Sequence, residues 1–275
     1  MKQKRVTKIF IYSLATVFLF IFLFPLFMIC STSFKSFVDA LAYPPKIFLF
    51  RPTLENYINY FADQDILLAL TNSIVVTVCS MALTLPMGLF AAYALARSNL
   101  RGSKFISVFF ICTRFIPFVS TLIPIYLIYT KVGLYDTRLG LILLTSASNV
   151  PYIVWIMRNF LKEVSISMEE AAWIDGCSRM RGIFHVVLPL ARSGLSATAV
   201  LTMIYTWNDY MTPMMLSGSM AKTLPLTMAP FMSEKGTLWN IMAAAGTIIL
   251  LPSIIFTAVN GRNLGRGISG GGVKE

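Results

Sequence analysis

Long apolar runs dominate this chain and limit the folds that are open to it. A helix of roughly 20 mainly apolar residues matches the hydrocarbon core of a bilayer, which is about 30 Å thick. We place such runs near residues 9–30, 70–96, 105–130, 137–157, 194–216 and 239–260. They predict an all-α integral membrane protein with six transmembrane helices in a single domain over residues 1–275.

The overall composition supports this interpretation. Hydrophobic residues make up 56% of the chain, charged residues 13%, and the mean hydropathy is +0.72. A single soluble core cannot bury that much apolar surface. The run that starts at Ile9 and continues to Met28 is too long for a secretory signal, so we interpret it as a retained first span.

The basic charge follows the predicted membrane topology. A net charge of +11 in a soluble protein would suggest nucleic acid as a partner, which we do not expect here. With the N-terminus inside, fifteen of the 23 Lys and Arg residues fall in cytoplasmic segments, seven in outer segments, and Arg114 inside a span. This bias predicts that both termini are cytoplasmic.

The longest basic interruption lies between the fourth and fifth runs, over about 163–190. Ser167 and Glu170 have the spacing of a capping box, which predicts a short helix with Ser167 as its N-cap. Gly176 interrupts the helical run, and a second short helix is expected to lead to Pro189. We expect this segment to be a docking element on the cytoplasmic face.

One spaced motif in this segment carries a family resemblance. Glu170-Ala-Ala is followed by three residues and Gly176, then by nine residues, Val186, one residue and Leu188-Pro. This pattern resembles the cytoplasmic signature of permease subunits of ABC-type importers. Two positions differ from that signature: Cys177 replaces a usual alanine, and Ser193 stands where a second proline often follows.

Further segments along nearly the whole chain resemble the maltose-type branch of carbohydrate permeases. They are Ser33-Phe-Lys35, Tyr43-Pro-Pro45, Asn56-Tyr57, Asn72-Ser73, Ala91-Ala-Tyr-Ala-Leu-Ala-Arg97, Pro124-Ile-Tyr126, Gly133-Leu134, Thr206-Trp-Asn-Asp-Tyr210, Thr223-Leu-Pro-Leu226 and the tail from Gly267 to Lys274. Within the tail region, residues 260–264 lack the aromatic residues that are usual there.

The resemblance implies a fold, a set of partners and a location. The fold would be that of a type I ABC importer permease in a bacterial cell membrane. The partners would be a homologous second permease, two ATP-binding cassette ATPase subunits, an extracytoplasmic sugar-binding protein and membrane lipid. The sequence contains no phosphate-binding loop of the form G-x-x-x-x-G-K-[ST], so we expect ATP and magnesium on the partner ATPases and no cofactor on this chain.

Three groups of candidate site residues follow. The ATPase-coupling group comprises Glu170, Ala171, Ala172, Asp175 and Gly176. The alanines and the glycine would let the helix sit deeply in a groove of a partner, and the two acidic residues would pair with basic residues of that partner. Candidates for the substrate pathway are Trp207, Asn208, Asp209 and Tyr126, with helix packing as an equal alternative for the first three. The resemblance implies contact between the binding protein and a loop that includes Gly218, Lys222 and Thr223.

Several alternatives stay open at this point. Arg114 could pair with Asp209, or its side chain could extend to the cytoplasmic interface. The Glu170 signature is shared by permeases for amino acids, peptides and phosphate. A secondary transporter is a rival from another class, but the chain shows no convincing internal repeat. A membrane enzyme would need acidic catalytic residues, whereas the acidic residues lie mostly in predicted loops.

Overall fold

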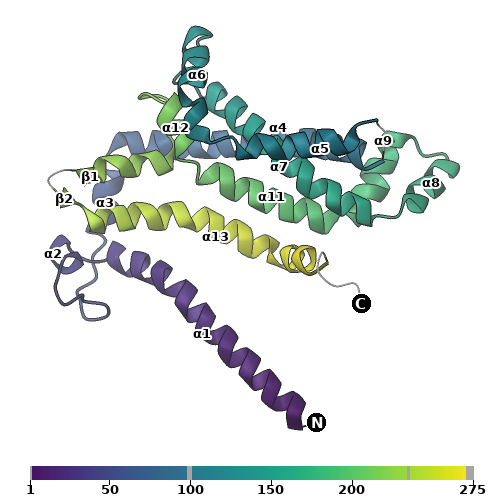
Figure 1. The fold of residues 1–275 in the computed structure, drawn as a ribbon. Helices are drawn as coiled ribbons and strands as arrows, with labels where there is room; N and C mark the ends of the chain where they lie inside the picture. Colours follow the sequence, from purple (N-terminus) through teal and green to yellow (C-terminus); the bar gives the residue numbers. More distant parts are fainter. Residues whose placement is uncertain (1, 98–100, 234–235, 271–275) are drawn as a thin grey trace. The chain divides into compact units, whose positions relative to one another are not determined.

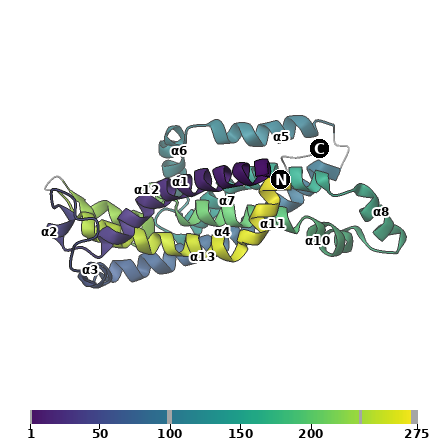
Figure 2. The ribbon, with the colours of Figure 1, turned by 90° about the horizontal axis from the view of Figure 1, so that it is seen from below.

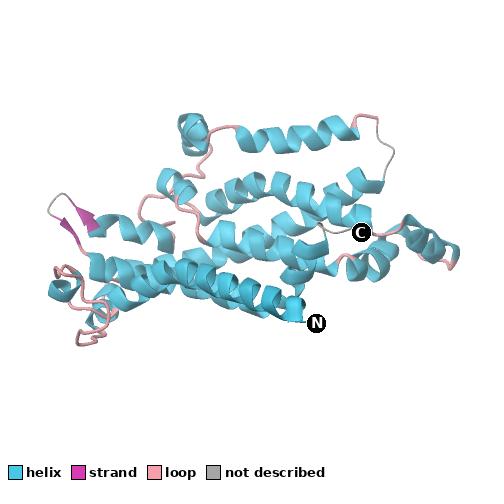
Figure 3. Cartoon of the chain, turned by 60° about the horizontal axis from the view of Figure 1, so that its bottom comes forward, coloured by secondary structure: helices cyan, strands magenta, loops and turns pink. Residues whose placement is uncertain are grey.

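The computed structural model describes residues 2–97, 101–233 and 236–270, and it is helical almost throughout (Figures 1 and 3). The long helices are α1 (Lys2–Ser33), α4 (Gln64–Arg97), α5 (Ser103–Cys112), α6 (Phe118–Lys131), α7 (Arg138–Glu163), α11 (Arg192–Trp207) and α13 (Trp239–Gly270). The shorter ones are α2 (Phe37–Ala40), α3 (Glu55–Phe61), α8 (Ile166–Ile174), α9 (Arg179–Gly182), α10 (Leu188–Leu190) and α12 (Met211–Leu216). Two 3₁₀ helices, η1 (Thr113–Phe115) and η3 (Leu224–Phe231), a π-helical segment η2 (Ile183–Val187) and an antiparallel pair of strands, β1 (Met232–Ser233) and β2 (Gly236–Thr237), complete the described elements.

Between four and six elements can cross a membrane. Four helices are long and apolar enough alone, over Thr7–Ser33, Gln64–Arg97, Arg138–Glu163 and Trp239–Gly261. Two further candidates are bent pairs, Ser103–Phe115 with Phe118–Lys131 and Arg179–Leu190 with Arg192–Trp207, with bends of 90° and 82°. The prediction of an all-α membrane protein is thereby confirmed, and six spans result if each bent pair counts as one.

Two of the predicted spans are not single continuous helices in the structure. The predicted span 105–130 breaks at Pro117, which has an extended backbone (ψ 123°) and lacks an N–H to continue the helix. The predicted span 194–216 breaks after Trp207, and α12 starts only at Met211. Pro189 lies in the segment just before α11, where the second bend occurs.

The helices group into two compact units, and the first comprises Met1–Leu67 and Thr227–Leu251. Its irregular segment after α1 is ordered by the buried Asn56, whose Nδ2 donates to the carbonyl oxygens of Ser33 and Lys35, both at 2.8 Å. Asn240 at the start of α13 donates to Asn56 Oδ1 at 2.7 Å. The Tyr60 hydroxyl and Thr227 Oγ1 share a hydrogen bond of 2.7 Å.

The second unit comprises Leu68–Leu226 and Pro252–Glu275. Within it, α7 packs against both α5 and α11, and Figure 2 shows α6 turning away from α5. Gly88 lets α4 approach α7 closely, because a Cβ there would lie 2.7 Å from the Cβ of Ile153. A buried apolar cluster joins α4, α7 and the segment before α11, and consists of Leu89, Ala92, Ile153, Met157, Leu161, Val187 and Ala191.

Candidate functional site

Helix α8 forms the core of the segment that the spaced motif singled out, but its N-terminus differs from the prediction. The N-cap residue is Ser165, with an extended backbone (φ −61°, ψ 132°), so the prediction of Ser167 as N-cap was wrong. Ser167 lies inside the helix, and its hydroxyl shares a hydrogen bond of 2.7 Å with the Ser165 hydroxyl. Glu170 therefore does not occupy the third helical position that a capping box requires.

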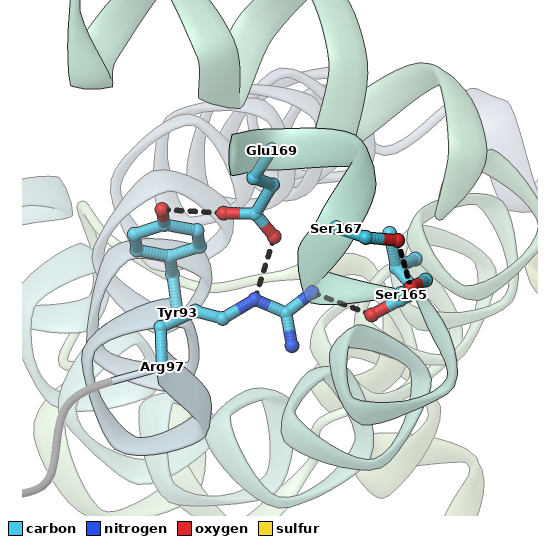
Figure 4. A network of polar contacts seen from close by, with 6 residues as sticks. Tyr93, Arg97, Ser165, Ser167 and Glu169 are labelled. Atoms are coloured by element: carbon cyan, nitrogen blue, oxygen red, sulfur yellow. Dashed lines mark hydrogen bonds and ion pairs between the residues drawn. The ribbon is translucent and has the colours of Figure 1, made fainter. Parts of the chain in front are cut away.

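A buried polar network joins α8 to the end of α4 (Figure 4). Glu169, only 1% exposed, accepts a hydrogen bond from Arg97 Nε at 2.6 Å and another from the Tyr93 hydroxyl at 2.8 Å. Arg97 Nη2 also donates to the carbonyl oxygen of Val164 at 2.8 Å, just before α8. Both carboxylate oxygens of Glu169 are thus satisfied, as a buried charge requires.

The C-terminus of α8 ends in a glycine-dependent turn. Gly176 has φ +88°, a conformation that glycine adopts without strain. The Cys177 N–H donates to the Ala172 carbonyl at 2.9 Å, and the Gly176 N–H donates to the Trp173 carbonyl at 3.1 Å. This is the Schellman pattern of helix termination. Helix α9 follows, and its N-cap is Ser178, so the predicted helix, glycine bend and second helix are confirmed.

The predicted coupling residues lie mostly on the open side of this segment. Glu170, Ala171, Asp175 and Gly176 are exposed, and Ala172 is half-buried. The sequence reasoning missed Glu169, which precedes the motif by one residue. Its partner Arg97 ends one of the segments that carried the resemblance. The sequence therefore drew attention to Arg97 but did not show that Arg97 pairs with Glu169. The coupling role of the five predicted residues stays a prediction.

At the opposite end of α7, a single aspartate organises the loop after α12. Asp136 precedes α7 in a left-handed conformation (φ 55°), and its carboxylate accepts hydrogen bonds from the backbone N–H groups of residues 218–221, at 2.8 to 3.1 Å. Burial alone would raise the pKa of the Asp136 carboxyl, but these four N–H donors outweigh burial and hold the pKa below its usual value. Gly218 leaves room for this contact, since a Cβ there would lie 2.9 Å from Asp136 Oδ2.

Helix α4 holds the same loop from a second direction. Asn72 Nδ2 donates to the carbonyl oxygens of Met220 and Lys222 at 2.8 and 2.7 Å, and Arg138 Nε donates to Asn72 Oδ1 at 2.6 Å. Ser73 Oγ accepts a hydrogen bond from the Leu224 N–H at 2.8 Å. These contacts fix the backbone of the loop.

Side-chain exposure within this loop is uneven. Of the predicted contact residues, Gly218 and Lys222 are half-buried, while Thr223 is only 5% exposed. Ser219 and Met220, which the sequence reasoning did not single out, are exposed. The accessible part of the loop is therefore its tip, and its contact role stays a prediction.

The predicted pathway residues separate into different environments. Trp207 is 4% exposed and is one of the buried residues of α11. Asn208 is exposed, and its Nδ2 donates to the Ile204 carbonyl at 2.8 Å and to Ser253 Oγ at 3.2 Å. Asp209 lines a cavity of about 190 Å³, whereas Tyr126 lines a separate, mainly apolar cavity of about 420 Å³.

Arg114 is not paired with Asp209 in the described residues, and the extension of its side chain to the cytoplasmic interface stays a prediction. Its side chain lies at the break between α5 and α6 and donates from Nη1 to the Ser148 carbonyl at 3.0 Å. Its guanidinium carbon is 5.9 Å from the centre of the Tyr152 ring. Arg114 and Asp209 line the same 190 Å³ cavity but form no ion pair in the described part of the chain.

Comparison with known proteins identifies the family of this chain. Residues 84–270 match the family of binding-protein-dependent transport system inner membrane components. A probable ABC transporter permease protein of Sinorhizobium fredii, y4oR, is 35% identical over 258 residues, which cover 94% of this chain and 92% of that protein. A probable starch degradation products transport system permease protein of Thermoanaerobacterium thermosulfurigenes, AmyC, is 31% identical over all of both chains.

A solved structure shows the same fold. A chain in the crystal structure of a bacterial ABC transporter that imports the acidic polysaccharide alginate matches with a TM-score of 0.77 and 22% identity, covering 96% of this chain and 98% of that one. The resemblance to ABC importer permeases is confirmed at the level of family and fold. This protein therefore belongs to the family of binding-protein-dependent transport system inner membrane components, as a multi-pass permease subunit of an ABC transporter that does not itself hydrolyse ATP.

Proposed function

We propose that this permease imports a sugar or oligosaccharide by alternating access, as a member of the maltose-type branch. Several relatives support the substrate class through their names. Besides the starch degradation products permease, a sulfoquinovosyl glycerol permease of Agrobacterium fabrum is 31% identical over 92% of this chain. A diacetylchitobiose permease of Streptomyces coelicolor is 29% identical over 95% of it.

The transporter is proposed to contain this chain, a homologous second permease, two ATPase subunits and an extracytoplasmic binding protein. The family description supports dependence on a binding protein. A second solved relative, of TM-score 0.68, was crystallised with an alginate pentasaccharide-bound periplasmic protein. ATP and magnesium are proposed to bind only to the ATPase subunits.

The coupling site is proposed to be the open side of α8. The observation that carries this proposal is the contrast between neighbouring glutamates, since Glu169 is buried against α4 while Glu170 faces outward. A helix held on one side and exposed on the other can dock in a partner and pass a rigid-body movement to the spans. Ala171 and Gly176 allow a close approach, and Glu170 and Asp175 offer charges to basic residues of an ATPase.

The loop after α12 is proposed to contact the binding protein through its exposed tip at Ser219 and Met220, with Gly218 and Lys222 beside it. Its fixed backbone supports this role, because a loop that is ordered before contact loses little conformational entropy on binding. Thr223 is buried, so it is proposed to support the loop instead of touching the partner.

The substrate pathway is proposed to pass Asp209, whose carboxylate lines a cavity with polar neighbours. The exposed Asn208 and Tyr126 are proposed to lie along the same route. For Trp207, its burial favours the packing role over stacking on a sugar ring.

The test is sugar uptake and ATP hydrolysis in proteoliposomes that contain the complete transporter, with Glu170→Ala and Gly176→Trp variants alongside. We expect both variants to assemble and to lose the stimulation of ATP hydrolysis by sugar-loaded binding protein. Normal stimulation in both would contradict the coupling site. Uptake by this chain alone on an ion gradient would contradict the proposed function, and uptake of amino acids, peptides or phosphate instead of sugars would contradict the substrate class.

A further inference from the structure

The break between α5 and α6 places a basic side chain inside a candidate membrane span. Helix α5 starts at Ser103, and Arg114 follows about 16 Å further along at roughly 1.5 Å per residue. That is about half of a hydrocarbon core of about 30 Å. The axes of the two helices differ by 90°, and Arg114 lies in the short η1 segment between them. An arginine at such a depth is a candidate functional residue by default.

Arg114 lies between two cavities. One of about 550 Å³ runs along the break, within the range of about 300–1,000 Å³ that is usual for ligand pockets. The other, of about 190 Å³, is more polar and is lined by Thr145, Asn149, Tyr205 and Asp209. Both cavities share Arg114, Phe118 and Ser148, so the guanidinium group borders both.

The charge of Arg114 has little compensation from the chain itself. Its one hydrogen bond in the described residues goes to the Ser148 carbonyl, and its guanidinium carbon lies 5.9 Å from the centre of the Tyr152 ring. No carboxylate lies within 4 Å of it in that part of the chain. Asp209, across the smaller cavity, accepts the Thr212 N–H at 3.1 Å through Oδ1. Most of the N–H donors of Arg114 are therefore available to a ligand.

A neutral ligand would remove water from this guanidinium group without replacing the lost interactions, which is costly for a charge. A carboxylate or sulfonate supplies both the opposite charge and a pair of acceptor oxygens that match the planar fork of arginine. The ring of Tyr205, 5.3 Å from that of Tyr152, and Phe118 add aromatic surface for the body of a sugar.

We propose that the two cavities that meet at Arg114 together bind an acidic saccharide, and that Arg114 binds its carboxylate or sulfonate group. Asn149 and Asp209 would take the hydroxyl groups of the same sugar. The inference rests on the proposed function and deepens it, because it names the charge of the substrate. Arg114 acts here as a specificity-determining residue.

The test is isothermal titration of the complete transporter in nanodiscs, without binding protein, so that only the permease site is measured. The two probes are a disaccharide that contains glucuronic acid and the neutral disaccharide of the same linkage. We expect the acidic probe to bind at least about tenfold more tightly, as for a charge-assisted bidentate pair. Arg114→Gln should abolish the preference, and Arg114→Lys should keep part of it. Lys104→Gln removes an exposed positive charge from the preceding helix α5, outside the two cavities, and should leave the preference unchanged.

Four results would overturn the inference. Equal binding of the two probes, or a preference that survives in Arg114→Gln, would show that Arg114 does not select an acidic group. Loss of assembly with the second permease in Arg114→Gln, but not in Arg114→Lys, would show that Arg114 pairs with a carboxylate of that subunit. ATP-driven uptake of neutral sugars with no charge preference would overturn this inference alone, whereas uptake of a non-sugar solute and no binding of either probe would also contradict the proposed function.

Discussion

Two carboxylates hold the two segments to which we assign partner contacts, and they do so by different means. Glu169 fixes α8 through the side chains of Arg97 and Tyr93, which both belong to α4. Asp136 fixes the loop after α12 through four backbone N–H groups of the loop itself. Glu169 thus joins one helix to another, while Asp136 gives a short loop a single shape.

This difference has consequences for movement. A side-chain pair between two helices makes them move together, so displacement of α8 would reach α4 and the span that it forms. A carboxylate that binds the loop backbone instead keeps the tip ordered, whichever side chains the tip carries. The two ends of the second unit therefore suit different tasks. Helix α8 suits the transmission of movement to the spans, and the loop after α12 suits contact with a partner through an ordered tip.

The largest expected effect comes from breaking the α8 connection. Glu169→Ala would leave the Arg97 guanidinium buried and without its carboxylate partner, which typically costs about 3–5 kcal/mol of unfolding free energy. We expect a clear drop in Tm of the purified permease in detergent. Glu163→Ala, which removes an exposed glutamate at the end of α7, should change Tm little.

A double-mutant cycle sharpens this result. If Glu169 and Arg97 act as a pair, the combined Glu169→Ala and Arg97→Ala variant should lose much less stability than the sum of the single variants. Additive losses would mean that the two residues stabilise the protein independently. That result would contradict the claim that Glu169 joins α8 to α4 through Arg97.

The second effect concerns the outer loop. Asp136→Asn keeps a residue that tolerates the left-handed backbone but replaces one acceptor oxygen with an amide that faces N–H donors. We expect a loss of roughly 2 kcal/mol, as for hydrogen bonds to a charged group. Thermal unfolding of the variant measures it, and Asp63→Asn in an exposed turn is the matched control. An equal, small effect of both changes would show that the loop does not depend on Asp136.

The same variant gives a pH dependence. The folded pKa of Asp136 is below the value of about 3.9 for an unfolded chain, so its stabilisation is fully present above pH 3.9. As pH falls through the lower folded pKa, the carboxylate is protonated and that stabilisation is lost. The difference in Tm between the wild-type protein and Asp136→Asn should therefore be constant from about pH 7 to pH 5 and shrink below pH 4. A difference that grows on acidification would contradict the lowered pKa.

A smaller effect separates the two partners of Glu169. Tyr93→Phe removes the hydroxyl that donates to one oxygen of the carboxylate and leaves the Arg97 contact in place. We expect a loss of about 1.5 kcal/mol, the low end for a hydrogen bond to a charged group. The measurement is again Tm, and a loss as large as that of Glu169→Ala would show that Arg97 contributes little.

The smallest effect tests the end of α8. Gly176 has φ +88° with open space around its Cα, so Gly176→Ala meets no neighbouring atom and only strains the backbone. The expected loss is about 1 kcal/mol. Gly246→Ala, in a helix and with only ordinary contacts nearby, should cost less or even stabilise, and the comparison of the two Tm values gives the backbone contribution.

Much of the fold could be predicted because membrane spans leave a strong signal in a single sequence. The apolar runs marked the helices, and Gly176 marked the end of α8. The positions of the breaks at Pro117 and after Trp207 could not be read from hydropathy, because apolar residues continue across both and a hydropathy profile holds no information on helix direction. The N-terminus of α8 was misplaced for a related reason, since Ser165 and Ser167 offer the same capping chemistry two residues apart.

The polar networks show where single-sequence reasoning ends. The segments containing Arg97 and Asn72 carried the family resemblance, yet their partners Glu169 and Met220 lie at least 72 residues away along the chain. Only the folded chain brings them together. The role of Asp136 could not be predicted either, because its partners are backbone N–H groups, which every residue except proline carries.

The most direct test of the account is the distance between α8 and α4 in the two nucleotide states of the complete transporter. Spin labels at Met87→Cys and Ile174→Cys, both at exposed positions of this chain and in a background without its four native cysteines, report it by pulsed electron paramagnetic resonance. We expect one narrow distance distribution that stays the same with and without bound ATP, and a broad one when Glu169→Gln is added. A distance that shifts with nucleotide while Glu169 is intact would contradict the claim that this residue joins α8 rigidly to the membrane spans.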